Sequence, residues 1–157
     1  MRAEFVNPFI ESVYELFNTM LGAKVSRTGI GLSDGQKRAT EIVALIGFSG
    51  VMRGTVGLAL PAATCSAMVS RLLGDAADSS QETIDDTIGE LVNIVAGSAK
   101  AKLSTKLGKT LDLSLPVILS GEKYEVYSPS QATWLEVPFS SELGDLVVRL
   151  SFQDDPA

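Results

Sequence analysis

The stretch that decides the fold runs from Gln81 to Leu107 and reads QETIDDTIGELVNIVAGSAKAKLSTKL. At about 100° of rotation per residue, its spacing predicts one long amphipathic helix. Asp86, Glu90 and Asn93 recur at i, i+4 and i+7, so they fall within roughly 60° of each other on one face. The residues on the opposite side are apolar: Ile84, Ile88, Leu91, Val92, Val95, Ala99 and Leu103. The sequence therefore predicts an outward stripe of two carboxylates and one amide.

The same helix contains residues that weaken it. Gly89 and Gly97 each cost about 1 kcal/mol relative to alanine in a helix interior, and Asn93 competes for backbone hydrogen bonds. Gly97 shares the face of Glu90 and Asn93, where its missing side chain leaves room for another backbone to come close. Two interpretations stay open: the stripe is an ordinary solvated face, or it is a docking or reaction site.

The rest of the chain alternates between helical and β-type patterns. A first helix is expected from Asn7-Pro8, an N-cap followed by a first-turn proline, to Gly22, and a second from about Ala62 to Leu73. Strands are expected at Lys24–Leu32, Glu41–Phe48, Met52–Leu60, Asp112–Leu119, Glu122–Tyr127, Ala132–Phe139 and Leu146–Phe152. Pro116 inside one of them indicates an edge strand or a bulge. This order predicts an α+β fold, a mostly antiparallel sheet with helices packed on it.

Composition limits the classes of partner. The 157 residues are 45% hydrophobic and 20% charged, and no linker rich in proline or serine divides them, so we expect a single domain over residues 1–157. The net charge of −6 argues against nucleic acid and against an anionic membrane surface. No apolar run is long enough to span a bilayer and no secretion signal is recognisable, so a cytoplasmic location is expected. Such a protein would meet a partner surface rich in Lys or Arg.

The sequence also limits the chemistry. It contains no histidine, which removes the commonest general base and metal ligand. Cys65 is the single cysteine, so an internal disulfide and a cysteine metal cluster are excluded, and its apolar surroundings predict a buried core thiol. There is no GxxxxGK[ST] phosphate loop. We therefore predict that this chain binds no metal or cofactor of its own. For phosphoryl chemistry, both the metal and the phosphate would arrive on a partner.

The residue types in the stripe suit one kind of reaction. The Glu90 carboxylate can accept hydrogen bonds or pair with a cation, and the Asn93 amide can donate and accept at once. An amide that holds a water molecule can direct its lone pair at an electrophile, although it is a weak base. This positioning suits hydrolysis of an already activated bond, such as phosphoryl transfer to water.

The first expected helix repeats the polar pattern of the long one. Glu11, Glu15 and Asn18 have the same i, i+4, i+7 spacing, and both stripes read acid-x-x-x-Glu-x-x-Asn. Each stripe opens a segment of one helix followed by strands, so an internal duplication would account for the match. Chance is the competing explanation, because short polar stripes are common on surface helices.

A longer pattern includes a residue beyond the helix. Asp86-x-x-x-Glu90-x-x-Asn93 is followed, after 22 further residues, by Pro116. This combination resembles the signature of the CheC/CheX/FliY phosphatases of bacterial chemotaxis: an acidic or serine residue, then Glu and Asn on a helix, then a distant proline. The length of the chain, its helix–strand order and the strand at residues 54–58 also resemble this family. The single-site form of this length is CheX-like.

The resemblance implies a CheC-like fold and hydrolysis of the aspartyl phosphate on a CheY-like response regulator. In that case Glu90 pairs with a lysine of the regulator and Asn93 orients the attacking water. Asp86 and Pro116 carry over as motif positions. The regulator would supply Mg²⁺, and a homodimer is implied as well. The alternative is a noncatalytic module that uses the same helix to bind a response regulator or a flagellar switch protein.

The resemblance also bears on the first helix, since some members of the family carry two active stripes. Counting the same gap from Asn18 leads to Glu41, where the motif requires proline. We therefore expect Glu15 and Asn18 to form a degenerate second site.

Overall fold

The computed structural model describes residues 3–33, 41–50, 52–74, 80–120 and 134–153. The helices are α1 (Ala3–Leu16), the π-helical turn η1 (Phe17–Leu21), α2 (Ala62–Leu73) and α3 (Gln81–Leu107). The strands are β1 (Val25–Arg27), β2 (Gly31–Ser33), β3 (Glu41–Gly50), β4 (Arg53–Pro61), β5 (Leu111–Leu113), β6 (Val117–Leu119), β7 (Trp134–Ser141) and β8 (Leu146–Gln153). The expected strand Glu122–Tyr127 lies outside the described residues.

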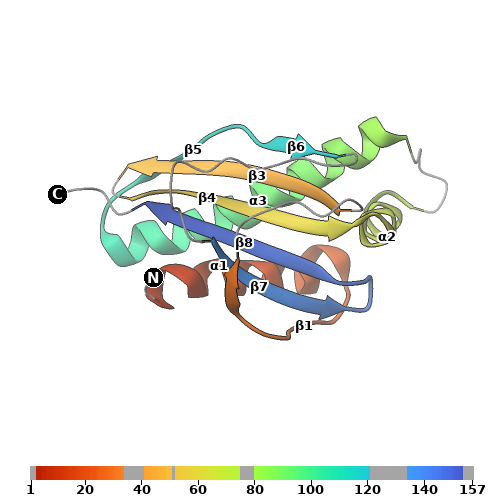
Figure 1. Cartoon of the computed structure of the whole chain (residues 1–157), viewed down its shortest axis with the longest axis horizontal. Helices are drawn as coiled ribbons and strands as arrows, with labels where there is room; N and C mark the ends of the chain where they lie inside the picture. Colours follow the sequence, from red (N-terminus) through yellow and green to blue (C-terminus); the bar gives the residue numbers. More distant parts are fainter. Residues whose placement is uncertain (1–2, 34–40, 51, 75–79, 121–133, 154–157) are drawn as a thin grey trace.

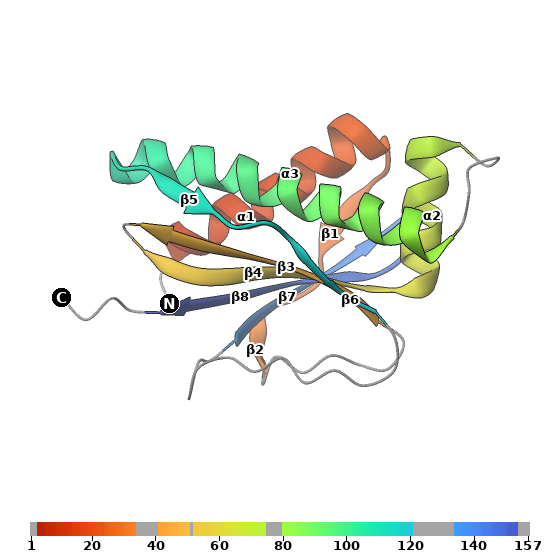
Figure 2. The same cartoon turned by 90° about the horizontal axis from the view of Figure 1, so that it is seen from above.

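One sheet joins these strands (Figure 1). Its order is β1-β7-β8-β4-β3-β5, with β2 also paired to β7 and β6 also paired to β3. The pairings between the described strands are antiparallel. Helices α1 and α3 lie across one face of the sheet, and α2 stands at its end (Figure 2). This arrangement confirms the predicted α+β fold with helices packed on an antiparallel sheet.

The main core lies between the helices and the sheet face that they cover. The apolar side of α3 is buried as predicted, except that Ile84 is only partly covered. Alternate residues of the central strands meet it: Ile42, Ala44, Ile46 and Phe48 from β3, Val56, Leu58 and Leu60 from β4, and Val148 and Leu150 from β8. Cys65 in α2 is fully buried, and this burial raises the pKa of its thiol to about 12, so the predicted core thiol is confirmed.

Local capping fixes both ends of α3 at the predicted residues. The Ser80 hydroxyl accepts a hydrogen bond from the Thr83 backbone N–H at 3.2 Å, which is the N-cap arrangement. At the other end Gly108 adopts a left-handed φ of 65° and its N–H donates to the Ser104 carbonyl. A glycine is favoured there because side chains rarely adopt this conformation.

The start of α1 differs from the prediction. The helix begins at Ala3, so Pro8 lies inside it and is not a first-turn residue. A proline in a helix removes one backbone hydrogen bond. Here Val6 and Phe9, which are 4% and 2% exposed, pack into the core on either side of it, and this burial outweighs the lost bond. The predicted end is confirmed, since Gly22 is left-handed with a φ of 57°.

Two predicted strands are each split by a one-residue bulge. Between the pairs Arg27–Phe139 and Gly31–Glu136 the first strand advances four residues while β7 advances three, which separates β1 from β2. Between Leu113–Phe48 and Val117–Leu45 the count is again four against three, which separates β5 from β6. Pro116 lies in the second bulge, which pairs with β3 at the edge of the sheet, as a proline in a strand predicts.

Candidate functional site

The outward face of α3 carries the predicted stripe. Asp86 and Glu90 are exposed and Asn93 is partly exposed, while their neighbours Ile88, Leu91 and Val92 anchor the opposite side in the core. The rotation of the helix is therefore set by burial, and it leaves the acid–amide pair on an open surface. The predicted outward orientation is confirmed.

The bulge between β5 and β6 brings Pro116 to this helix, which runs between α1 and that bulge (Figure 2). A Cβ placed on Gly89 would lie 3.8 Å from Pro116 Cγ and 3.4 Å from Ile118 Cδ1. Gly89 directly precedes Glu90, so Pro116 and Ile118 pack against the helix at the turn that carries the stripe. The fold thus joins Pro116 to the stripe across a gap of 22 residues in the sequence.

Gly97 has a different environment. A Cβ at this position would meet nothing within 4 Å apart from its own helix backbone and chain neighbours, so no part of the described fold requires a glycine there. The open space lies one turn beyond Asn93 on the outward face. This agrees with the prediction that Gly97 leaves room for a partner.

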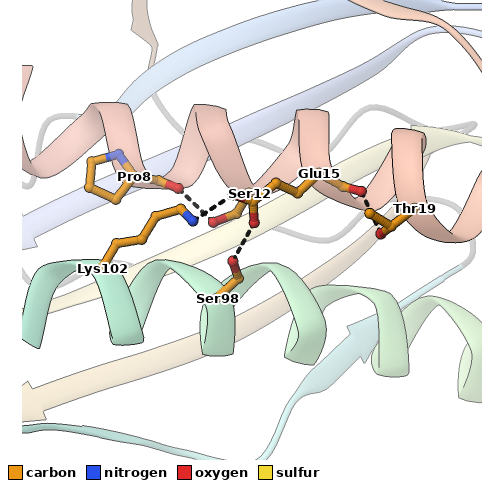
Figure 3. Close-up of polar contacts among 6 residues, drawn as sticks. All are labelled: Pro8, Ser12, Glu15, Thr19, Ser98 and Lys102. Carbon is orange, nitrogen blue, oxygen red and sulfur yellow. Dashed lines mark hydrogen bonds and ion pairs between the residues drawn. The ribbon is translucent and has the colours of Figure 1, made fainter.

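The second stripe, by contrast, is engaged within the protein. Lys102 Nζ of α3 lies 2.6 Å from Glu15 Oε1, and the Ser98 hydroxyl donates to Glu15 Oε2 at 3.0 Å (Figure 3). These contacts join α1 to α3. Asn18 is exposed and borders an open hollow with Glu15, Tyr14 and Lys24. A carboxylate that already holds an internal lysine is poorly placed to pair with one from a partner.

The Glu15–Lys102 pair makes stability depend on pH. The hydrogen bonds from Lys102 and then Ser98 lower the pKa of Glu15 from its ordinary value of 4.5. The stabilisation is therefore complete above that value and is lost as the pH falls through the lowered pKa. Because about half of the Glu15 side chain is exposed, we expect Glu15→Gln to cost only about 0.5 kcal/mol at pH 7. Denaturant titrations at pH 7 and pH 3 check this, and an equal cost at both would contradict it.

The sheet register identifies the true counterpart of Pro116 in the first half. β1 and β2 pair with β7 residues 139–141 and 134–136, and β5 and β6 pair with β3 residues 48–50 and 43–45. The residues of β1 and β2 therefore correspond to those of β5 and β6 with one constant difference in residue number. This difference places Ile30 at the position of Pro116. Counting a fixed gap led to Glu41 because the first helical segment ends at Leu21, 3 residues after Asn18, whereas α3 continues to Leu107, 14 residues after Asn93. The first half still lacks the proline.

The chain is similar to proteins of known family. A family model described as Chemotaxis phosphatase CheX matches residues 42–140. A relative from Thermotoga maritima, described as CheY-P phosphatase CheX, is 30% identical over 129 residues, which cover 82% of this chain and 83% of the relative. The chain belongs to the CheX family of chemotaxis phosphatases. The family resemblance drawn from Asp86, Glu90, Asn93 and Pro116 is confirmed.

Solved structures share the fold of this CheX-family protein. A CheC-like superfamily protein from Shewanella sp. PV-4 is 26% identical with a TM-score of 0.84, covering 98% of this chain and 100% of its own. CheX from Borrelia burgdorferi, solved as a complex with CheY, BeF₃ and Mg²⁺, is 22% identical with a TM-score of 0.81 and covers 98% and 100%. The implied CheC-like fold is confirmed.

One charged cluster in this CheX-family protein was not predicted from its sequence. Arg149 on β8 is 3% exposed; its Nε lies 2.9 Å from Glu136 Oε1 and its Nη2 lies 3.3 Å from Glu41 Oε2. Glu41, counted above as the missing proline, is thus part of a buried ion pair between strands. The available signal was an arginine within the mostly apolar strand Leu146–Phe152.

The described residues show neither a metal-binding cluster nor a membrane-spanning helix. No group of three or more His, Cys, Asp or Glu side chains among them is arranged to hold a metal ion. In the same ranges, no helix has the length and apolar character needed to cross a bilayer.

Proposed function

We propose that this protein hydrolyses the aspartyl phosphate of a CheY-like response regulator, with Glu90 and Asn93 as its catalytic residues. The observation that carries the proposal is the exposed acid–amide pair on α3, next to the point where Pro116 packs against Gly89. Its relative from Thermotoga maritima is described as a CheY-P phosphatase, and the Borrelia burgdorferi CheX was solved with CheY. Both descriptions support a regulator as the partner of this chain.

In the proposed reaction, Glu90 accepts hydrogen bonds from a lysine ammonium of the regulator and so fixes the orientation of the two proteins. Asn93 binds one water molecule through its amide and holds it in line with the phosphorus–oxygen bond to the aspartate. The water oxygen forms the new bond to phosphorus. The bond to the aspartyl oxygen breaks, its electron pair stays with the carboxylate, and the proton of the water leaves with the phosphate or to solvent.

The regulator supplies the remaining groups in this proposal. Mg²⁺ on the regulator would neutralise charge on the phosphoryl oxygens, and this chain would contribute positioning alone. The exposed position of Asp86 and Glu90 supports these roles, because an exposed helix face can approach the active site of a partner. We also propose a cytoplasmic homodimer of single-domain subunits, which the solution mass tests.

The proposal is tested by turnover. A CheY protein from the genome that encodes this chain is phosphorylated with acetyl phosphate and Mg²⁺, and phosphate release is followed after a substoichiometric amount of this protein is added. Several phosphates released per protein, faster than autodephosphorylation, would support the phosphatase. Binding of the phosphorylated regulator without a change in its decay rate would overturn it in favour of the noncatalytic module.

Gly97 gives a separate test of where the regulator docks. Gly97→Ala should raise the free energy of unfolding by about 1 kcal/mol, since alanine favours the helix and its Cβ meets open space. Gly97→Leu should raise KM for the phosphorylated regulator about tenfold and leave kcat nearly unchanged, because the larger side chain occupies the approach path.

The matched control is Ala63→Leu, an exposed position on α2. It should leave both kinetic constants unchanged. A normal KM for Gly97→Leu would show that the regulator does not approach this turn of α3.

A further inference from the structure

The bulge between β5 and β6 presents an unusual side chain. Leu115 is 86% exposed, the highest value among the large exposed apolar residues of the described chain. Scattered apolar residues on a surface need no explanation. The surroundings of Leu115, however, distinguish it from the others.

The residues on either side hold Leu115 in place. The Ser114 backbone N–H donates to the Gly47 carbonyl at 2.9 Å, and the Gly47 N–H donates to the Ser114 hydroxyl at 2.9 Å. On the other side Pro116 has a fixed φ and packs toward Gly89 of α3. Because the backbone around Leu115 is already constrained, the segment loses little backbone freedom when a partner covers it, which favours its use as an anchor.

The position of Leu115 connects it to the proposed catalytic residues. The next residue, Pro116, packs toward Gly89, which directly precedes Glu90, so the bulge that carries Leu115 lies beside this turn of α3. Val117, in the strand that follows the bulge, is 55% exposed. Its neighbour Ile118 contacts the α3 side, and strand alternation turns Val117 to the opposite face of the sheet.

The first half of the fold provides an internal comparison. The register offset that relates Pro116 to Ile30 places Gly29 at the position of Leu115. The first half, in which Glu15 pairs with Lys102, therefore has a glycine at this position. The second half, in which Glu90 is exposed, has a leucine at the same position. The exposed anchor and the open stripe occur together.

We propose that Leu115 is an apolar anchor for the receiver domain of the phosphorylated response regulator. The inference rests on the proposed function and adds a binding contact outside the catalytic pair. A regulator whose phosphoaspartate reaches Asn93 must cover the surface around α3, and the bulge is part of that surface. A second copy of this chain is the competing occupant, and the test below includes it.

The test compares Leu115→Ser with Leu32→Ser, a matched control at 75% exposure on β2. The probe is the CheY protein used above, phosphorylated with acetyl phosphate and Mg²⁺. Leu115→Ser should raise KM about tenfold with kcat within twofold of the wild type, and it should weaken binding of the beryllofluoride-activated regulator by the same factor. Leu32→Ser should change neither constant.

The outcomes separate the anchor from the phosphatase. A wild-type protein without turnover would overturn the proposed function itself. With an active wild type, an unchanged KM for Leu115→Ser would overturn the anchor alone. A halved solution mass for Leu115→Ser, measured by light scattering, would also overturn it and would assign the bulge to contacts between copies of this chain.

Discussion

Asn93→Ala is expected to lower kcat for the phosphorylated regulator by about 100-fold or more, because a water that is no longer held in line must find its geometry by chance. The fold should survive. Asn93 lies off the core side of α3 and alanine is the better helix former, so the free energy of unfolding should not fall. Stopped-flow measurement of phosphate release under saturating regulator gives kcat separately from KM.

The chain supplies its own control for this experiment. Asn18→Ala removes the same amide from the corresponding position of the first stripe, and it should leave turnover unchanged because that stripe is engaged by Lys102 and Ser98. If Asn18→Ala lowered kcat as well, the first stripe would be active. If Asn93→Ala retained wild-type turnover, Asn93 would not position the water.

Local signals explain why the long helix could be predicted so closely. Its start is encoded by Ser80 as N-cap, its end by Gly108, and its rotation by the apolar periodicity, all of which lie within one stretch of sequence. The same reasoning failed for α1, where Pro8 resembles a first-turn proline. The tertiary burial of Val6 and Phe9, which a local pattern does not contain, decides that boundary.

The environment of the site depends on contacts between distant segments. Nothing in the sequence says that Gly89 faces Pro116, or that Glu15 meets Lys102 across two helices. The first contact depends on the bulged sheet edge beside α3, and the second depends on the packing of α1 against α3. The missing proline predicted that the first stripe is degenerate, but the engagement of its Glu15 by Lys102 and Ser98 became visible only with the packing of α1 on α3.

The sheet also supports the internal duplication. The bulged segment that follows α1 pairs with β7 of the second half, and the one that follows α3 pairs with β3 of the first half, each with the same register and the same extra residue. Chance repetition of a short polar stripe would not produce this exchange of strands. We infer that the two halves share an origin. In the first half the motif proline was lost, and Glu15 now pairs with Lys102 within the protein.

Arg149→Met is expected to have the largest effect on stability, a loss of about 3–5 kcal/mol in the free energy of unfolding. The guanidinium reaches across β4, where the intervening Gly57 and Ala59 are small, to Glu41 on β3, and it also contacts Glu136 on β7. Removing this cation withdraws the charge that faces a carboxylate only 9% exposed. A buried carboxylate in that position is costly.

Chemical denaturation at pH 7 measures the loss in the free energy of unfolding. The control is Arg53→Met, at an exposed arginine on β4, which should change that free energy by less than about 0.5 kcal/mol. Should Arg149→Met not fold, Arg149→Lys keeps the charge but cannot contact both carboxylates with one planar group, and it should lose part of the same free energy. Wild-type stability in either Arg149 variant would show that the cluster does not hold the strands together. Since the pair lies on the sheet face away from α3, refolded Arg149→Lys should keep its kcat, which separates the stability of the scaffold from the chemistry on the helix.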